Sequence, residues 1–150
     1  MRHRQAIALL ALIGWFIALY LWLYKIGAIG SLTCGTGACE YVQTSRWAVW
    51  LGLPVAFYGV VGYAALHVVA LVGVQPAYAT RRAPTLLLAA LASGGLLFTL
   101  YLIYLELFVI HAICRWCMGS AVIIGLIWLI ALDGLRRSRV RGDVGSWDRP

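Results

Sequence analysis

The sequence predicts an all-α integral membrane protein, a bundle of four transmembrane helices with an extracytoplasmic loop or short helix between the first two. Of its 150 residues, 63% are hydrophobic and only 11% are charged, whereas a soluble domain carries about 25% charged residues. The apolar residues also gather into four long runs separated by short polar segments. A chain with this much apolar surface needs the bilayer as part of its solvent.

Each of the four runs is long enough to cross a hydrocarbon core of about 30 Å. The first run follows a basic N-terminus, as in a signal peptide, but it is too long and has no cleavage motif, so we expect a retained helix. Pro84 opens the third run, at a position that favours proline. The fourth run stops at Asp133–Gly134, and residues 134–150 form a basic tail of one membrane domain, 1–150. The expected spans cover roughly residues 5–26, 50–74, 85–110 and 116–132.

The positions of lysine and arginine predict the orientation, because basic residues are enriched on the cytoplasmic side. With both termini cytoplasmic at the plasma (inner) membrane, nine basic residues lie inside and three outside. This orientation signal, together with attraction to anionic lipid, explains the net charge of +7. No nucleic-acid module is visible in the sequence. The inner nine are Arg2, Arg4, Arg81, Arg82, Arg136, Arg137, Arg139, Arg141 and Arg149, and the outer three are Lys25, Arg46 and Arg115.

In this orientation all four cysteines lie at the extracytoplasmic surface, where disulfides form and persist. Cys34 and Cys39 follow the first span, and Cys114 and Cys117 precede the fourth. A four-thiolate zinc site would need all four to converge, usually in a small polar fold, so we expect no metal. Two structural disulfides remain an alternative.

The Cys114–Cys117 pair is expected to be redox-active. Two intervening residues close too small a loop to constrain the unfolded chain much, and this spacing is typical of reversible thiol chemistry. Cys117 is expected in the first turn of the fourth span, where the positive end of the helix dipole stabilises a thiolate. Arg115 adds a nearby cation.

The Cys34–Cys39 pair encloses two glycines, which favours a mobile segment. Such a pair fits a shuttle that exchanges disulfides with a soluble partner and passes electrons to a fixed second pair. The alternative is a rigid loop staple.

These motifs together resemble the vitamin K epoxide reductase family, over roughly residues 5 to 135. The resemblance rests on the order of the spans and cysteine pairs and on four motifs. They are residues 39–47 (CEYVQTSRW), Gly52-Leu53-Pro54, Tyr58-Gly59 and Cys114-Arg115-Trp116-Cys117.

The resemblance implies a four-helix bundle enclosing a quinone, either ubiquinone or menaquinone, as electron acceptor. It implies that Cys117 faces the quinone and that Cys114 exchanges with the loop. By the same match Cys39 pairs transiently with Cys114, and Cys34 exchanges with a thioredoxin-fold protein. Some relatives carry that partner as a fused domain; here a separate extracytoplasmic (periplasmic) protein is expected. Ser45 matches a family serine, or else caps a short surface helix.

Two departures bear on the substrate. Vertebrate members are expected to hold the quinone with an asparagine and a tyrosine, yet this chain has no asparagine and carries Ala121 at the tyrosine position. Plain quinone reduction is therefore favoured over epoxide reduction. The function predicted is a membrane thiol:quinone oxidoreductase; a non-catalytic scaffold with two structural disulfides is the alternative.

Several other residues are candidates for a role near the site. Glu106 is ionisable within an apolar run: it either reaches the interface or delivers protons. His111 is either an interfacial residue or tunes the Cys114 thiol. His67 is expected to be satisfied by a helix–helix contact. The aromatic candidates for lining a ring-shaped ligand are Phe57, Tyr58, Tyr101 and Tyr104.

Overall fold

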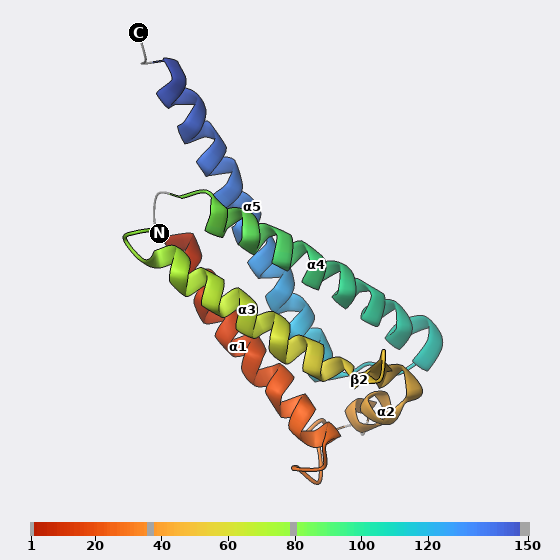
Figure 1. The fold of residues 1–150 in the computed structure, drawn as a ribbon. Coiled ribbons are helices and arrows are strands. Elements are labelled where there is room, and N and C mark those ends of the chain that lie inside the picture. Colours follow the sequence, from red (N-terminus) through yellow and green to blue (C-terminus); the bar gives the residue numbers. More distant parts are fainter. Residues whose placement is uncertain (1, 36–37, 79–80, 148–150) are drawn as a thin grey trace.

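Four long helices form a bundle (Figure 1). The computed structural model describes residues 2–35, 38–78 and 81–147. All four helices are long and apolar enough to cross a membrane, which confirms the predicted fold class. The N-terminus and the far end of the last helix lie at one end of the bundle, and the short elements that follow the first helix lie at the other (Figure 1). The long helices are α1 (Arg2–Lys25), α3 (Val55–Val74), α4 (Ala83–Leu105) and α5 (Arg115–Trp147).

Small residues fill much of the helix interfaces, while larger apolar side chains face outward. This arrangement suits a bilayer, where lipid is as apolar as leucine and close backbone packing brings helices together. A Cβ at Gly14 of α1 would overlap the Tyr63 ring of α3, and one at Gly59 would press on Ala18. The buried alanines include Ala8, Ala11, Ala18, Ala70, Ala92 and Ala131, and the exposed apolar residues include Leu9, Phe16, Val61, Val68, Leu97 and Leu129.

Arg4 fastens the helices together at the end that carries the N-terminus. Its side chain is only 4% exposed. The guanidinium donates hydrogen bonds to the Gly73 carbonyl, to the Arg81 carbonyl at 3.0 Å and to Thr85 Oγ1 at 2.9 Å. A cation here also complements the negative C-terminal end of α3. In the same half of the bundle, His67 Nδ1 lies 2.9 Å from the Ala8 carbonyl, so its predicted helix–helix contact is confirmed.

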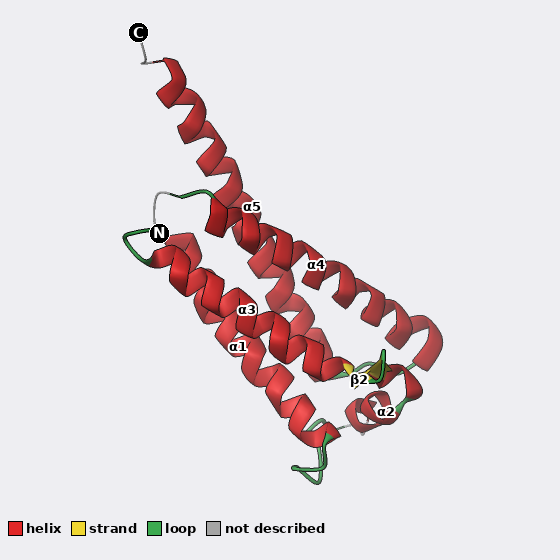
Figure 2. Ribbon diagram, viewed as in Figure 1, coloured by secondary structure: helices red, strands yellow, loops and turns green. Residues whose placement is uncertain are grey.

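Short elements cap the opposite end. They are α2 (Ala38–Thr44), the 3-10 helix η1 (Arg46–Ala48), and the strands β1 (Val49–Trp50) and β2 (Leu53–Pro54), which pair antiparallel (Figure 2). Positive φ angles at Leu51 and Gly52 allow the two-residue turn between the strands. The second span was expected to begin near Trp50, but its helix begins at Val55 because this hairpin occupies the preceding residues.

The third span reaches Ile110, its expected end, because a π-helical turn, η2 (Glu106–Ile110), follows α4. Helix α5, in contrast, does not stop at Asp133–Gly134. Arg137 Nε pairs with Asp133 Oδ2 at 2.9 Å, and Gly134 accommodates the His3 ring, so the helix continues through these residues. The last residues of the expected tail, 148–150, lie outside the described residues.

Candidate active site

Both cysteine pairs lie at the capped end of the bundle. Cys34 and Cys39 form a disulfide with Cα atoms 6.0 Å apart, whereas Cys114 and Cys117 are free thiols. Cys114 and Cys39 are fully buried, and Cys34 is 5% exposed. The two pairs share one apolar cluster, so chain segments far apart in sequence meet there. The buried members of this cluster are Leu21, Leu32, Cys34, Cys39, Val42, Ala56 and Cys114.

Cys114 occupies the N-cap position of α5. Its sulfur accepts a hydrogen bond from the Cys117 backbone N–H at 3.4 Å, the bond that an N-cap side chain normally accepts. A hydrogen bond from the Cys117 side chain lowers the pKa of Cys114; burial opposes this, while the backbone N–H groups of Cys117 and Trp116 support it. The dipole argument placed the stabilised thiolate on Cys117. The structure instead directs the first-turn donors onto Cys114, because that residue, not Cys117, caps the helix.

The loop that carries Cys34 is fastened over the head of α5. Trp116 Nε1 donates to the Thr33 carbonyl at 3.2 Å, and its ring lies 5.2 Å from that of Tyr20. The Tyr20 hydroxyl in turn accepts the Thr33 N–H at 3.0 Å, and Glu40 Oε1 accepts the Leu32 N–H at 2.9 Å. These contacts hold the loop disulfide beside the second pair. Gly35 has a positive φ of 76°, while Gly37 lies outside the described residues.

A cavity of about 520 Å³ lies among the four long helices, with Cys117 in its wall. The lining along α4 runs from Leu87 to Glu106, a rise of roughly 28 Å at about 1.5 Å per residue. Most of the wall is apolar, and glycines such as Gly62 and Gly94 widen it. The cavity is therefore long and mostly apolar, with a thiol in its wall near one end.

Polar groups gather in the wall near Cys117. Gln43, from α2, directs its side-chain Nε2 at Cys117 Sγ, 3.8 Å away. Lys25 Nζ donates a hydrogen bond to the backbone carbonyl of Gln43 at 2.6 Å. Tyr63 OH and Ser120 Oγ lie 2.8 Å apart. The residues among these that line the cavity could present polar atoms to a carbonyl-bearing ligand; they are Gln43, Tyr63, Cys117 and Ser120.

Glu106 is a further lining residue and is 4% exposed. Its Oε2 accepts the Cys114 N–H at 3.1 Å, and its carboxyl lines the same cavity wall as the Cys117 side chain. The interpretation that Glu106 only reaches the interface is therefore wrong. His111, by contrast, is exposed, and its left-handed backbone closes the π-helical turn.

The predicted ring-lining aromatics are divided between several places. Tyr58 lines the cavity, although its hydroxyl is taken by the Trp50 carbonyl at 3.0 Å. Phe57 packs on Trp22 with ring centroids 5.7 Å apart. Tyr104 is exposed and stacks on Phe108.

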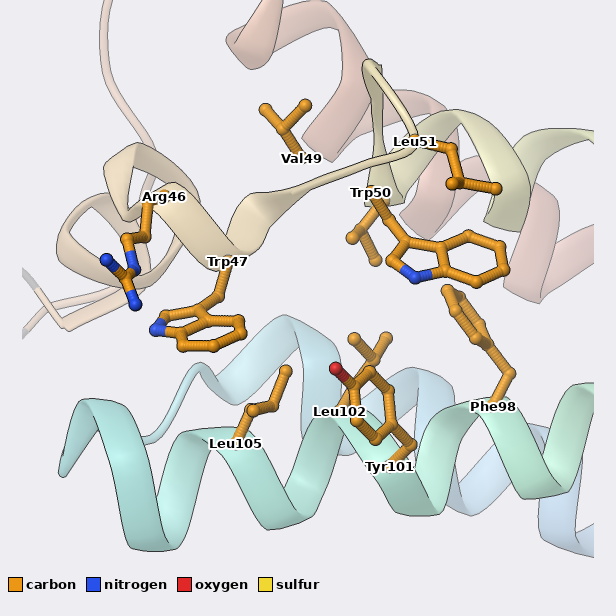
Figure 3. Close-up of a pocket in the computed structure, with 10 residues that line it drawn as sticks. Arg46, Trp47, Val49, Trp50, Leu51, Phe98, Tyr101, Leu102 and Leu105 are labelled. Carbon is orange, nitrogen blue, oxygen red and sulfur yellow. The ribbon is translucent and has the colours of Figure 1, made fainter.

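Tyr101 lines a second, smaller pocket of about 310 Å³ beside the cavity (Figure 3). Figure 3 shows Trp47 and Trp50 from the cap facing Phe98 and Tyr101 of α4. Phe98 lines both spaces and is in ring contact with Trp50. The two spaces are thus neighbours beneath the cap.

Ser45 and Ala121, matched by resemblance, are not among the described residues that line the cavity. Ser45 precedes η1 without capping it through its side chain; its Oγ donates to the Val42 carbonyl at 2.7 Å. Ser45 thus occupies the predicted N-cap position without the side-chain bond, and the role implied by the family match stays a prediction. Ala121 is half-buried on α5.

Sequence reasoning missed Gln43, Tyr63, Ser120 and Thr99 as lining residues. Two signals were available: Gln43 lies four residues after Cys39, and Ser120 three after Cys117, each about one helical turn away. Tyr63 and Thr99 gave no such signal, because their place depends on how α3 and α4 pack. Within the described residues, no group of three or more His, Cys, Asp or Glu side chains could hold a metal ion.

A four-helix membrane fold with paired cysteines beside a cavity defines the class: an integral membrane protein with a redox role. Residues 5–132 match the model of the vitamin K epoxide reductase family. The chain belongs to this family, which confirms the resemblance drawn from the cysteine motifs. The matched segment contains all four cysteines and most of each span.

Proposed function

We propose that the protein is a thiol:quinone oxidoreductase that makes disulfides. Electrons would pass from a thioredoxin-fold carrier to Cys34–Cys39, then to Cys114–Cys117, and then to a membrane quinone. The observation that carries this proposal is the position of Cys117: its side chain lines a long apolar cavity, while its partner Cys114 packs in one cluster with Cys39.

The exchange between the pairs is a thiolate attack on a disulfide. In the proposed direction, Cys39 of the reduced loop pair attacks Cys114 in the Cys114–Cys117 disulfide. Cys34 then attacks Cys39 and releases Cys114. The lowered pKa of Cys114 makes it a better leaving group in this last step, and Cys39 belongs to the same buried cluster. This supports the assignment of Cys114 to exchange with Cys39. Cys34 would then exchange with the carrier, which requires the loop to open because Cys34 is 5% exposed in this state.

The cavity supports a quinone as electron acceptor. A length of roughly 28 Å along α4 suits a ring with an isoprenoid tail, and most of the lining is apolar. Gln43 and Ser120 are the residues that would bind the ring oxygens, in place of the asparagine, which this chain lacks, and of the tyrosine, whose position holds Ala121. Quinone, either ubiquinone or menaquinone, is therefore favoured over vitamin K epoxide. The wall residues Leu87 and Leu91 are exposed, which supports lateral exchange of quinone with lipid.

A scaffold with two structural disulfides is the second candidate. Against it stand the free thiols of Cys114 and Cys117 and the polar groups gathered around Cys117. A purely structural staple would not need an amide directed at the Cys117 sulfur and a buried carboxyl in the same cavity wall.

The decisive experiment mixes the purified protein with a reduced thioredoxin-fold carrier, with and without a short-chain ubiquinone analogue. We expect carrier oxidation that depends on quinone and stops in C117S. The C39A variant should trap Cys34 in a mixed disulfide with the carrier. If the intact protein oxidises no carrier, the scaffold is favoured; if C117S still reduces quinone, the relay is wrong.

A further inference from the structure

Glu106 is a carboxyl group buried at the point where the cysteine pair meets the cavity. It is 4% exposed and lines the cavity with Cys117. Burying a carboxylate is costly unless other groups compensate. Among the described residues, the ion pair seen is Asp133–Arg137, at the far end of the bundle. The groups that face Glu106 are instead the two cysteines.

A local distortion of the backbone brings these groups together. Glu106 begins the π-helical turn η2, and both His111 and Ala112 donate their N–H groups to its carbonyl. His111 has a φ of 55°, an unusual angle for a residue other than glycine. Single π-helical turns of this kind are frequent at functional sites. The turn reverses the chain, so that Cys114, eight residues later, donates its N–H to Glu106 Oε2 at 3.1 Å.

The carboxyl thereby lies with both halves of the thiol pair. It accepts the backbone N–H of Cys114 and lines the same cavity wall as the side chain of Cys117. The bond to Cys114 fixes the carboxyl in place. Its place in the wall with Cys117 gives it access to the only proton that must leave when that sulfur reacts.

We propose that Glu106 is a catalytic residue that takes the Cys117 thiol proton and delivers it to the oxygen of a quinone bound in the cavity. This rests on the proposed function. The Cys117 S–H bond breaks and a Cys114–Cys117 disulfide forms, so two electrons leave the sulfurs. The quinone accepts both electrons and becomes a quinol. One of its two protons comes from Cys117 through Glu106, and the other comes from solvent, replacing the proton already lost by the Cys114 thiolate.

The test separates the two half-reactions in E106Q. Glutamine keeps the size and an oxygen that accepts the Cys114 N–H, but it cannot carry the proton. In the absence of quinone, the rate of disulfide exchange with the reduced carrier is monitored by thiol trapping. In E106Q this rate should stay within about twofold of wild type. With a short-chain ubiquinone analogue, kcat should fall by about 100-fold or more, the size of a lost general acid–base group, while KM changes little. E106D, which restores a carboxyl, should recover part of the rate.

D133N is the matched control, because it makes the same carboxyl-to-amide change at the other end of the bundle, where Asp133 pairs with Arg137 and does not line the cavity. Its quinone kcat should be that of wild type. A wild-type kcat in E106Q overturns the proposal. So does an equal loss of both half-reactions in E106Q, which would mean that Glu106 acts only through the fold. If the wild-type protein itself exchanges disulfides but never reduces quinone, the proposed function fails, and this inference fails with it.

Discussion

Cys114 shows how one residue can serve both helix structure and thiol chemistry. As the N-cap of α5, its sulfur accepts a backbone N–H that would otherwise lack a partner. The same bonds that begin the helix stabilise the charged form of the thiol. The reactive state of Cys114 therefore adds to helix stability instead of opposing it.

The Cys117 side chain should control the pH dependence of exchange at Cys114, since its hydrogen bond is the largest cause of the lowered pKa. C117A removes the donor, so the pKa of Cys114 rises, and the reverse exchange, in which the Cys114 thiolate attacks the loop disulfide, shifts to higher pH. C117S keeps a donor and should retain a profile at lower pH. The rate is measured by alkylating the Cys34 thiol released at each pH. Coincident profiles would contradict this assignment.

At the scale of residues, the sequence was sufficient for the four cysteines and insufficient for most of the cavity wall. The cysteines were predictable because the chain has only four, at spacings with a chemical meaning. Gln43 and Tyr63 were not, because Gln43 reaches the cavity from the cap and Tyr63 depends on the missing side chain at Gly14. Tyr104 lies two residues before Glu106 in the same span but faces outward, and the apolar pattern of this span does not show which face is inside.

At the scale of elements, α3 and α4 shape the cavity through glycine. A Cβ added at Gly62 or Gly94 would meet no atom within 4 Å, and both residues line the cavity. The cavity is therefore open beside these helices because Gly62 and Gly94 carry no side chains. Each such glycine destabilises its helix by about 1 kcal/mol relative to alanine.

Filling this space should impair quinone reduction without harming the fold. G94L places an apolar side chain in the cavity, and we expect quinone reduction to fall by about tenfold, the effect of losing roughly 1.4 kcal/mol of binding. Carrier exchange in the absence of quinone should be unchanged. G125L is the control, because Gly125 also has open space around it but is not among the lining residues. Equal quinone rates in both variants would argue against binding beside Gly94.

The element boundaries show where a pattern of apolar residues stops being informative. Trp50 and Leu53 read as the start of a span, yet they form a hairpin because Leu51 and Gly52 adopt a turn. Asp133 and Gly134 read as a stop, yet the helix continues past them. Both outcomes depend on local backbone geometry and tertiary contacts, which hydropathy does not measure.

At the scale of the whole molecule, the bundle separates its chemistry from most of its basic residues. The cysteine pairs lie at the capped end (Figure 1), and at the other end Arg4 joins α1 to the α3–α4 turn that carries Arg81 and Arg82. The fold class was predictable because four long apolar runs admit few arrangements in a bilayer. The arginine distribution adds an orientation, with the cysteines outside, which remains a prediction.

That orientation can be measured with two exposed positions at opposite ends of the bundle. Ser31 lies in the loop before Cys34, and Ala77 lies in the turn after α3; both are exposed. In a background with the native cysteines replaced by serine, a membrane-impermeant maleimide should label S31C but not A77C in intact cells, because arginine-rich turns stay cytoplasmic. Both should be labelled after permeabilisation, which shows that each variant is inserted and reactive. The reverse pattern would place the cysteines in the reducing cytoplasm, where a disulfide-generating relay would work against the thiol pool.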